Sequence, residues 1–132
     1  MVELSRINYA QKYLDDARML FAAERYNSAT SRLYYASYQA MWAALGPPMG
    51  DRIWRHLAII KPFVHGYWFD PAHPLQAPGL LEQFRLPLRQ LYTLRVRVDY
   101  DLLEIKRDVV DNMIKLVGDV INTVLAKGRV SQ

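Results

Sequence analysis

Apolar residues recur at intervals of three and four along most of the chain, which is the spacing of amphipathic helices rather than of strands. Clusters of glycine and proline separate these periodic segments. The pattern therefore predicts five helices, over residues 5 to about 24, 29–45, 52 to about 65, 80–97 and 101 to about 126.

Polar residues precede several of these segments and are suited to cap them, because their side chains accept the free N–H groups of a first helical turn. Ser5 is placed to cap the first helix, the pair Asn27-Ser28 the second, and Asp51 the third. Asp101, with Glu104 three residues later, resembles a capping box that opens the last helix.

Prolines and glycines mark where the helices end or bend. Gly46-Pro47-Pro48 ends the second helix, because proline lacks an N–H donor and fixes its own φ. Pro62 predicts a kink in the third helix, and Pro87 interrupts the fourth near its start. Residues 66–79, GYWFDPAHPLQAPG, form the longest predicted loop. We expect the tryptophans to be packing residues, although the aromatics at 67–69 are also suited to covering a groove or a partner.

The second and last helices carry the most informative apolar faces. In the second, a narrow stripe of small residues permits close approach of another helix: Ala29, Leu33, Ala36, Ala40 and Ala44. In the last, two stripes run side by side: Leu102, Ile105, Val109, Leu116 and Val120, then Leu103, Val110, Ile114, Val117, Ile121 and Val124. So wide an apolar arc belongs either to a central helix or to one that also packs against a second subunit.

These features predict an all-α fold, an antiparallel up-and-down helical bundle of four to five helices, in a single domain over residues 1–132. The composition agrees, since 52% hydrophobic and 23% charged residues are typical of a globular chain. With no cysteine there is no disulfide, no thiolate metal site and no cysteine nucleophile, which favours a cytoplasmic setting. We expect no targeting segment and no membrane span, because the uncharged stretch 33–50 is broken by its glycine and prolines.

The net charge of +4 is concentrated in the middle of the chain. Residues 52–97 carry seven basic side chains against only Asp70 and Glu82, together with all three histidines. This surplus suits an anionic partner such as a nucleotide, RNA or an acidic protein surface, or else it is spread over solvated faces. The histidines and Asp70 follow no recognised ligand spacing, so we expect no metal and no cofactor.

Two motifs stand out, with a histidine between them. The first motif is Arg32, Tyr34, Tyr35 and Ala36; the second is Arg95, Val98, Asp99 and Tyr100; the histidine is His56. Together they resemble the HEPN family of nucleotide-binding helical domains, in particular its small prokaryotic members. The similarity spans nearly the whole chain. It implies a helical bundle that binds nucleotide or RNA, acts as a homodimer, and forms one component of a prokaryotic toxin–antitoxin module with a nucleotidyltransferase partner.

Ribonucleases of this family carry an arginine followed four to six residues later by a histidine, whereas Arg95 is followed by Asp99, Tyr100 and Asp101. RNA cleavage without a metal needs a proton acceptor with a pKa near 7, and tyrosine, at about 10, is a poor substitute for histidine. Catalysis therefore has only weak candidates, namely His56, Arg95 and Tyr100. The alternatives to a binding protein are a divergent metal-independent ribonuclease, using His56 with Arg95 or Arg97, and a non-catalytic interaction scaffold.

The expected nucleotide or RNA site comprises Arg32, Tyr35, His56, Arg95, Arg97, Asp99 and Tyr100. Arg95 and Arg97 would hold phosphate, and Tyr35 or Tyr100 would stack or donate. Structural roles compete with these: an ion pair between Arg32 and Asp99, another between Arg95 and Asp99 one turn apart, and core packing of the tyrosines. The resemblance makes Tyr100 an acceptor for modification by the partner, and the alternative is a tyrosine that locks the junction of the last two helices.

Overall fold

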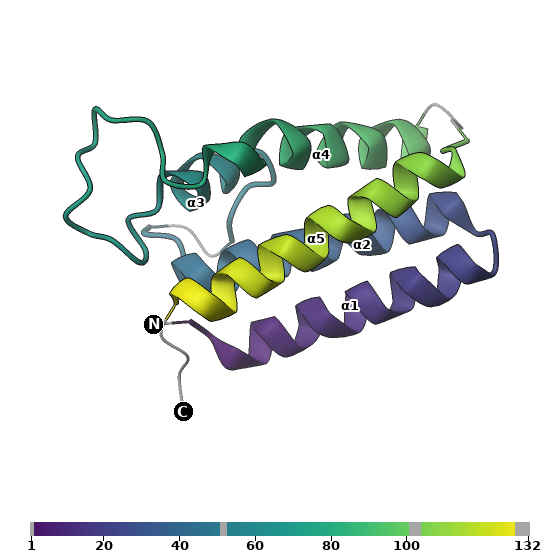
Figure 1. Cartoon of the computed structure of the whole chain (residues 1–132), viewed down its shortest axis with the longest axis horizontal. Helices are drawn as coiled ribbons and strands as arrows, with labels where there is room; N and C mark the ends of the chain where they lie inside the picture. The colour runs from purple at the N-terminus through teal and green to yellow at the C-terminus, as the bar shows by residue number, and fades with distance from the viewer. Residues whose placement is uncertain (1, 51–52, 101–103, 129–132) are drawn as a thin grey trace.

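The structure is a computed structural model that describes residues 2–50, 53–100 and 104–128. Five helices and a short 3-10 turn follow in order: α1 (Leu4–Ala22), α2 (Tyr26–Leu45), α3 (Ile60–His65), η1 (Glu82–Phe84), α4 (Arg85–Tyr100) and α5 (Arg107–Lys127). No strand forms in these ranges. The four long helices run alternately up and down, and the loop after α3 extends from one end of the bundle (Figure 1). The predicted all-α bundle is therefore confirmed.

Helix α2 lies at the centre and packs against α1, α4, α5 and the short α3. Its predicted small residues are fully buried, and two alanines of α1, Ala10 and Ala17, are fully buried as well, which brings the two backbones close together. The apolar arc of α5 is split. The buried residues do not coincide with one predicted stripe: they are Val110, Val117, Ile121 and Val124 of the second stripe and Val120 of the first. The neighbouring Val109, Ile114 and Leu116 are only half-buried.

The third helix is much shorter than predicted. Residues 53–59 form turns, and only Ile60–His65 is helical. Contacts with α2 explain the difference: the Tyr38 hydroxyl donates to the Trp54 carbonyl, and Trp54 Nε1 donates to the Gly46 carbonyl at 2.7 Å. Pro62 is the third residue of α3, where a missing N–H costs nothing, so it starts the helix rather than kinking it.

The predicted caps do not act as such. Helix α1 begins at Leu4, so Ser5 lies inside it, and α2 begins at Tyr26, with Asn27 and Ser28 already in its first turn. Asn27 instead accepts the backbone N–H of Ile105 through Oδ1 at 2.9 Å, which ties the chain leading into α5 to the start of α2. The residue named for the third cap, Asp51, lies outside the described residues.

The fourth and fifth helices also differ at their ends. Residues 82–84 form the 3-10 turn, and α4 then runs without interruption to Tyr100, with Pro87 third in the helix where its N–H is not needed. Helix α5 begins at Arg107 rather than at the predicted capping box. Glu104 is not helical, and Asp101 lies outside the described residues together with two leucines of the predicted stripes, Leu102 and Leu103.

The long loop is held against the bundle by its aromatic residues. Trp68 stacks on Phe63 at 5.7 Å between ring centroids and donates from Nε1 to the Phe63 carbonyl. Phe69 packs edge-on against Trp68, and the Lys127 ammonium lies 5.1 Å from its ring. Trp68 and Phe69 therefore act as packing residues, which is the alternative to covering a groove or a partner. None of the helices in the described part of the chain is both long and apolar enough to cross a membrane.

Candidate functional site

An aromatic cluster forms where α4 and the turns before α3 meet α2. We define it by five residues: Tyr34, Tyr35, Tyr38, His56 and Tyr92. Tyr34 is its centre, because its ring lies between 5.4 and 6.3 Å from the rings of the other four, measured between centroids. The motif on α2 contributes Tyr34 and Tyr35, and Tyr38 joins them because it lies four residues after Tyr34 on the same helix face. The ring of Tyr34 is only 4% exposed, so this side chain is part of the core.

Tyr34 and His56 share a hydrogen bond between the phenol oxygen and Nδ1. Burial raises the pKa of Tyr34 well above its usual range. Burial also lowers the pKa of His56, and the nearby Arg95 charge adds to this effect. Both shifts keep the pair neutral. Because the structure gives the Tyr34 hydroxyl no other acceptor among the described residues, we assign its proton to the bond with Nδ1, and the ring proton of His56 is then on Nε2. His56 therefore presents an N–H donor to whatever lies beside it.

Arg95 brings a positive charge to the same cluster. Its guanidinium carbon lies 5.0 Å from the centroid of the Tyr34 ring, and Nη2 donates to the Tyr35 hydroxyl at 3.1 Å. Nε lies 3.2 Å from a carboxylate oxygen of Asp99, one turn further along α4. The side chain is only 21% exposed, so stacking and pairing fix the position of this cation.

Tyr38 anchors the segment that carries the histidine. Its hydroxyl donates to the backbone carbonyl of Trp54, two residues before His56. Burial raises the pKa of Tyr38, and the charge of Arg6 opposes that rise. The phenol thus stays protonated and able to donate, and the non-helical turns keep His56 over α2.

The structure brings together four of the predicted site residues: Tyr35, His56, Arg95 and Asp99. Arg32 is exposed on α2, with its guanidinium 5.8 Å from the Tyr13 ring, and the ion pair predicted between Arg32 and Asp99 does not form, because Asp99 pairs with Arg95.

The two remaining predicted residues lie away from the cluster. Arg97 lines a groove between α4 and α5, and Tyr100 is 81% exposed at the end of α4, so it does not lock the junction of the last two helices. Sequence reasoning missed Tyr92, which reaches the cluster because it lies three residues before Arg95 on the same helix.

The arrangement restricts the chemistry available to His56. A general base in RNA cleavage needs an unprotonated nitrogen facing the 2′-hydroxyl. Here Nδ1 accepts the Tyr34 proton and Nε2 carries its own, so the neutral ring offers no free lone pair. The geometry is suited to holding an anion or a base edge and is poorly suited to removing a proton.

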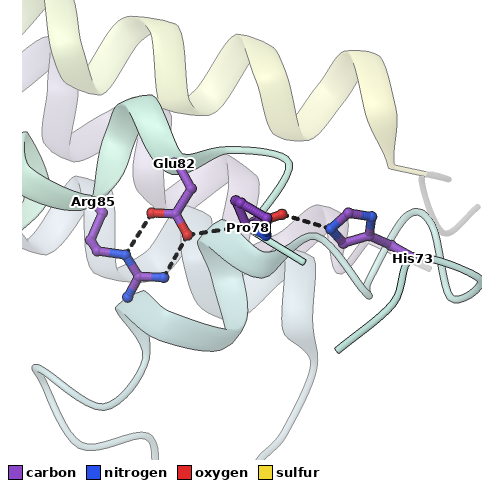
Figure 2. Close-up of polar contacts among 5 residues, drawn as sticks. His73, Pro78, Glu82 and Arg85 are labelled. Atoms are coloured by element: carbon purple, nitrogen blue, oxygen red, sulfur yellow. Dashed lines mark hydrogen bonds and ion pairs between the residues drawn. The ribbon is translucent and has the colours of Figure 1, made fainter. Parts of the chain in front are cut away.

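A second set of polar contacts fastens the long loop to the start of α4 (Figure 2). Arg85 donates to both carboxylate oxygens of Glu82, at 2.7 and 2.8 Å, and the Gly79 N–H donates to Oε1 at 3.0 Å. These donors lower the pKa of Glu82 to about 2. His73 Nε2 lies 2.7 Å from the Pro78 carbonyl oxygen. Nearby, both ring nitrogens of His65 are buried without a hydrogen-bond partner. Within the described ranges no three His, Cys, Asp or Glu side chains gather as metal ligands.

A family model for the HEPN domain matches residues 4–127. No curated protein and no solved structure matches the chain.

Proposed function

The chain belongs to the HEPN family, and from this premise we propose that it binds a nucleotide or a short stretch of RNA at the half-exposed edge of the aromatic cluster. Membership supports a nucleotide- or RNA-related function in general terms. The observation that carries the finer proposal is the meeting of the His56 ring, the Arg95 guanidinium and the Tyr35 hydroxyl at one place on α2 and α4.

These three groups suit a phosphate and a base. Arg95 Nε is buried 3.2 Å from the Asp99 carboxylate without a hydrogen bond, and one Nη2 proton goes to Tyr35, which leaves the other Nη2 proton and both Nη1 protons for phosphate oxygens. His56 adds a neutral Nε2–H donor. Tyr35 is half-buried, with the Arg95 guanidinium 5.5 Å and the Tyr13 ring 6.0 Å from its ring centroid, and these three groups form the platform against which a base would stack. Binding requires no proton transfer, which fits a histidine whose lowered pKa keeps it neutral.

The proposal also covers the oligomeric state, the cellular location and the partner protein. The protein acts as a homodimer in the cytoplasm, as one component of a toxin–antitoxin type module whose other component is a nucleotidyltransferase. This step rests on the family resemblance. Tyr100 would be the acceptor of the transferred nucleotide, and its 81% exposure leaves the hydroxyl open to a partner enzyme. In this step the Tyr100 oxygen forms a bond to the α-phosphorus of ATP, the phenol proton is lost and pyrophosphate leaves. Incubation with the cognate nucleotidyltransferase and ATP should therefore add one AMP group to the wild type and none to Tyr100→Phe, as measured by intact mass.

The binding proposal is tested by thermal unfolding with increasing ATP, GTP and a short single-stranded RNA, because a ligand of the folded state raises the melting temperature as its concentration rises. Arg95→Gln and His56→Gln are the test variants, each compared with its own ligand-free melting temperature. Arg97→Gln is the matched control, since it removes the same charge two residues away on the same helix. Solution mass measured alongside reports the dimer.

We expect wild-type protein to be stabilised by at least one of the three ligands. Arg95→Gln should weaken that ligand about tenfold or more, the usual loss for a hydrogen bond to a charged group, and His56→Gln about threefold to tenfold. Arg97→Gln should bind as the wild type does. Absence of any shift, or a loss confined to Arg97→Gln, contradicts the proposal. RNA cleavage by pure protein that His56→Gln abolishes would instead establish the ribonuclease alternative.

A further inference from the structure

A groove of about 740 Å³ runs between α4 and α5, on the side of α4 that faces away from the aromatic cluster. Its lining mixes two kinds of side chain. Leu86, Leu94, Val109 and Met113 are aliphatic; Arg85, Arg89 and Arg97 are cationic; Gln90, Thr93 and Asn112 complete it. None of the lining residues that the structure describes carries a carboxylate or an aromatic ring. Leu86, at 64%, is the most exposed of the four aliphatic lining residues, since the other three are half-buried.

The cationic edge continues beyond the groove. Arg85 and Arg89 also border a hollow of about 430 Å³ toward α3, which Lys61 and the exposed Leu57 line as well. Arg85 is already paired with Glu82. The other two basic residues at this edge, Arg89 and Lys61, are exposed, and no ion pair joins either of them to a carboxylate of the described residues. The surface therefore offers aliphatic contact flanked by positive charge.

The length of the groove suits a helix. The lining residues of α4 run from Arg85 to Arg97, which is a little over three turns or about 18 Å. Grooves with an aliphatic floor commonly receive the apolar face of an amphipathic helix, anchored at positions such as i, i+4 and i+7. A cationic edge adds a requirement that acidic residues flank those anchors.

Two other occupants fit less well. A second copy docking through this groove on a two-fold axis would bring two sets of arginines together, and none of the described lining residues is a carboxylate that could offset them. Single-stranded RNA gains most of its contact from bases stacked on aromatic rings or guanidinium planes, whereas the described lining has no aromatic ring and its floor is aliphatic. The geometry points to an acidic amphipathic helix of a partner protein as the occupant of the groove between α4 and α5.

The test uses two stapled peptides of about 14 residues, long enough to span the groove. The first carries leucines along one face and glutamates on both flanks, and the second has lysine at every glutamate position. Each is labelled and titrated with wild-type protein, Arg89→Glu and Leu86→Asp, with fluorescence anisotropy as the readout. Arg18→Glu on α1 is the matched control, because Arg18 is exposed and does not line the groove. Circular dichroism verifies that each variant folds.

We expect the acidic peptide to bind wild type in the micromolar range and the basic peptide to bind at least about tenfold more weakly. Arg89→Glu and Leu86→Asp should each lose about tenfold for the acidic peptide, while Arg18→Glu should change it by less than about twofold. Arg89→Glu should also gain affinity for the basic peptide. His56→Gln should leave peptide binding unchanged, which separates this surface from the nucleotide site.

Several results would overturn the inference. One is that the acidic peptide does not bind at about 1 mM, and another is that both peptides bind equally well. A dimer that Leu86→Asp dissociates, measured by sedimentation, would assign the groove to a second copy. RNA binding lost in Arg89→Glu but kept in His56→Gln would assign it to nucleic acid.

Discussion

Replacing Tyr34 by phenylalanine removes one oxygen from the centre of the aromatic cluster and leaves every ring contact in place. The only hydrogen bond the structure gives this hydroxyl is the one to His56 Nδ1. The ring, 4% exposed, and the Arg95 guanidinium above it should keep their positions. The change therefore isolates the contribution of a single hydrogen bond to folding and to the protonation of His56.

The expected loss of stability is about 1 kcal/mol. A hydrogen bond between neutral groups contributes about that much net, and His56 is half-buried, so water can reach Nδ1 in place of the phenol. For a chain of 132 residues, an entropy of unfolding of about 2.1 cal/mol/K per residue converts this loss into about 4 °C of melting temperature. Tyr34→Ala, which removes the ring, should cost about 3–5 kcal/mol.

The same substitution should alter the pH dependence. Burial and Arg95 lower the pKa of His56 in the folded protein, so the unfolded chain binds the proton first as the pH falls through about 6.5. Stability therefore decreases with acidification over this range. In Tyr34→Phe no phenol donates to Nδ1, so the neutral form of His56 is stabilised less relative to the protonated form. The pKa of His56 should rise toward its ordinary value, and the loss of stability on acidification should become smaller.

Urea unfolding at pH 7.5 and pH 5.5, with a proton NMR titration of the His56 ring, measures both effects. Tyr92→Phe is the control, because its ring packs in the same cluster and its hydroxyl has no hydrogen bond to a described residue; it should change stability by less than about 0.5 kcal/mol. A loss above about 3 kcal/mol in Tyr34→Phe, or a His56 titration unchanged by it, would refute the reasoning.

Three further predictions concern the loop that precedes α4. Gly79→Ala should destabilise the protein by about 2 kcal/mol or more in urea unfolding, because a Cβ there would lie 2.5 Å from the Val64 carbonyl oxygen and 2.9 Å from the Cα of His65. Glu82→Gln should lower the melting temperature at pH 7 but not at pH 2. Hydrogen bonds from Arg85 and Gly79 lower the pKa of the Glu82 carboxyl in the folded protein to about 2. The stabilisation that the ionised carboxylate provides is therefore present above the pKa of this group in the unfolded chain and is lost between about pH 4 and pH 2. His65→Phe should leave stability unchanged or raise it by up to about 1 kcal/mol, because it removes two buried nitrogens without partners and keeps an aromatic ring; a loss above 2 kcal/mol in thermal unfolding would contradict this.

The sequence predicted the bundle well where the residues spaced at helical intervals are also the residues that the core buries. The small residues of α2 are spaced at helical intervals and are buried where α1 approaches. The prediction was wrong over residues 53–59, although Ile53, Leu57, Ile60 and Val64 follow helical spacing. Ile53 and Leu57 are 64% and 45% exposed, so the spacing reflects no buried face, and hydrogen bonds involving α2 hold this segment in turns. Such bonds join residues eight or more positions apart, which local periodicity does not reveal.

The sequence also predicted part of the candidate site and missed the rest. The Arg95 and Asp99 pair follows from their separation by four residues on one helix, and the structure contains it. The bond between Tyr34 and His56 joins positions 22 apart and depends on the turns that replaced a predicted helix. The protonation of His56 follows from that bond and from burial, and neither is encoded in the spacing of the motifs.

The distribution of the basic residues on α4 explains why the charge of this segment did not distinguish a nucleotide or RNA from an acidic protein surface as the partner. Arg95 and Arg97 are two positions apart, so their side chains leave the helix about 200° from one another. Arg95 packs on the tyrosines of α2, while Arg97 joins Arg85 and Arg89 along the groove beside α5. Among the basic side chains of α4, Arg95 is thus largely covered by the tyrosines, whereas the groove holds the half-buried Arg85, paired with Glu82, and the exposed Arg89 and Arg97, all with aliphatic neighbours. A phosphate is best met by Arg95, because its donors are held in place, and an acidic helix by the groove, because its contacts are distributed over three turns.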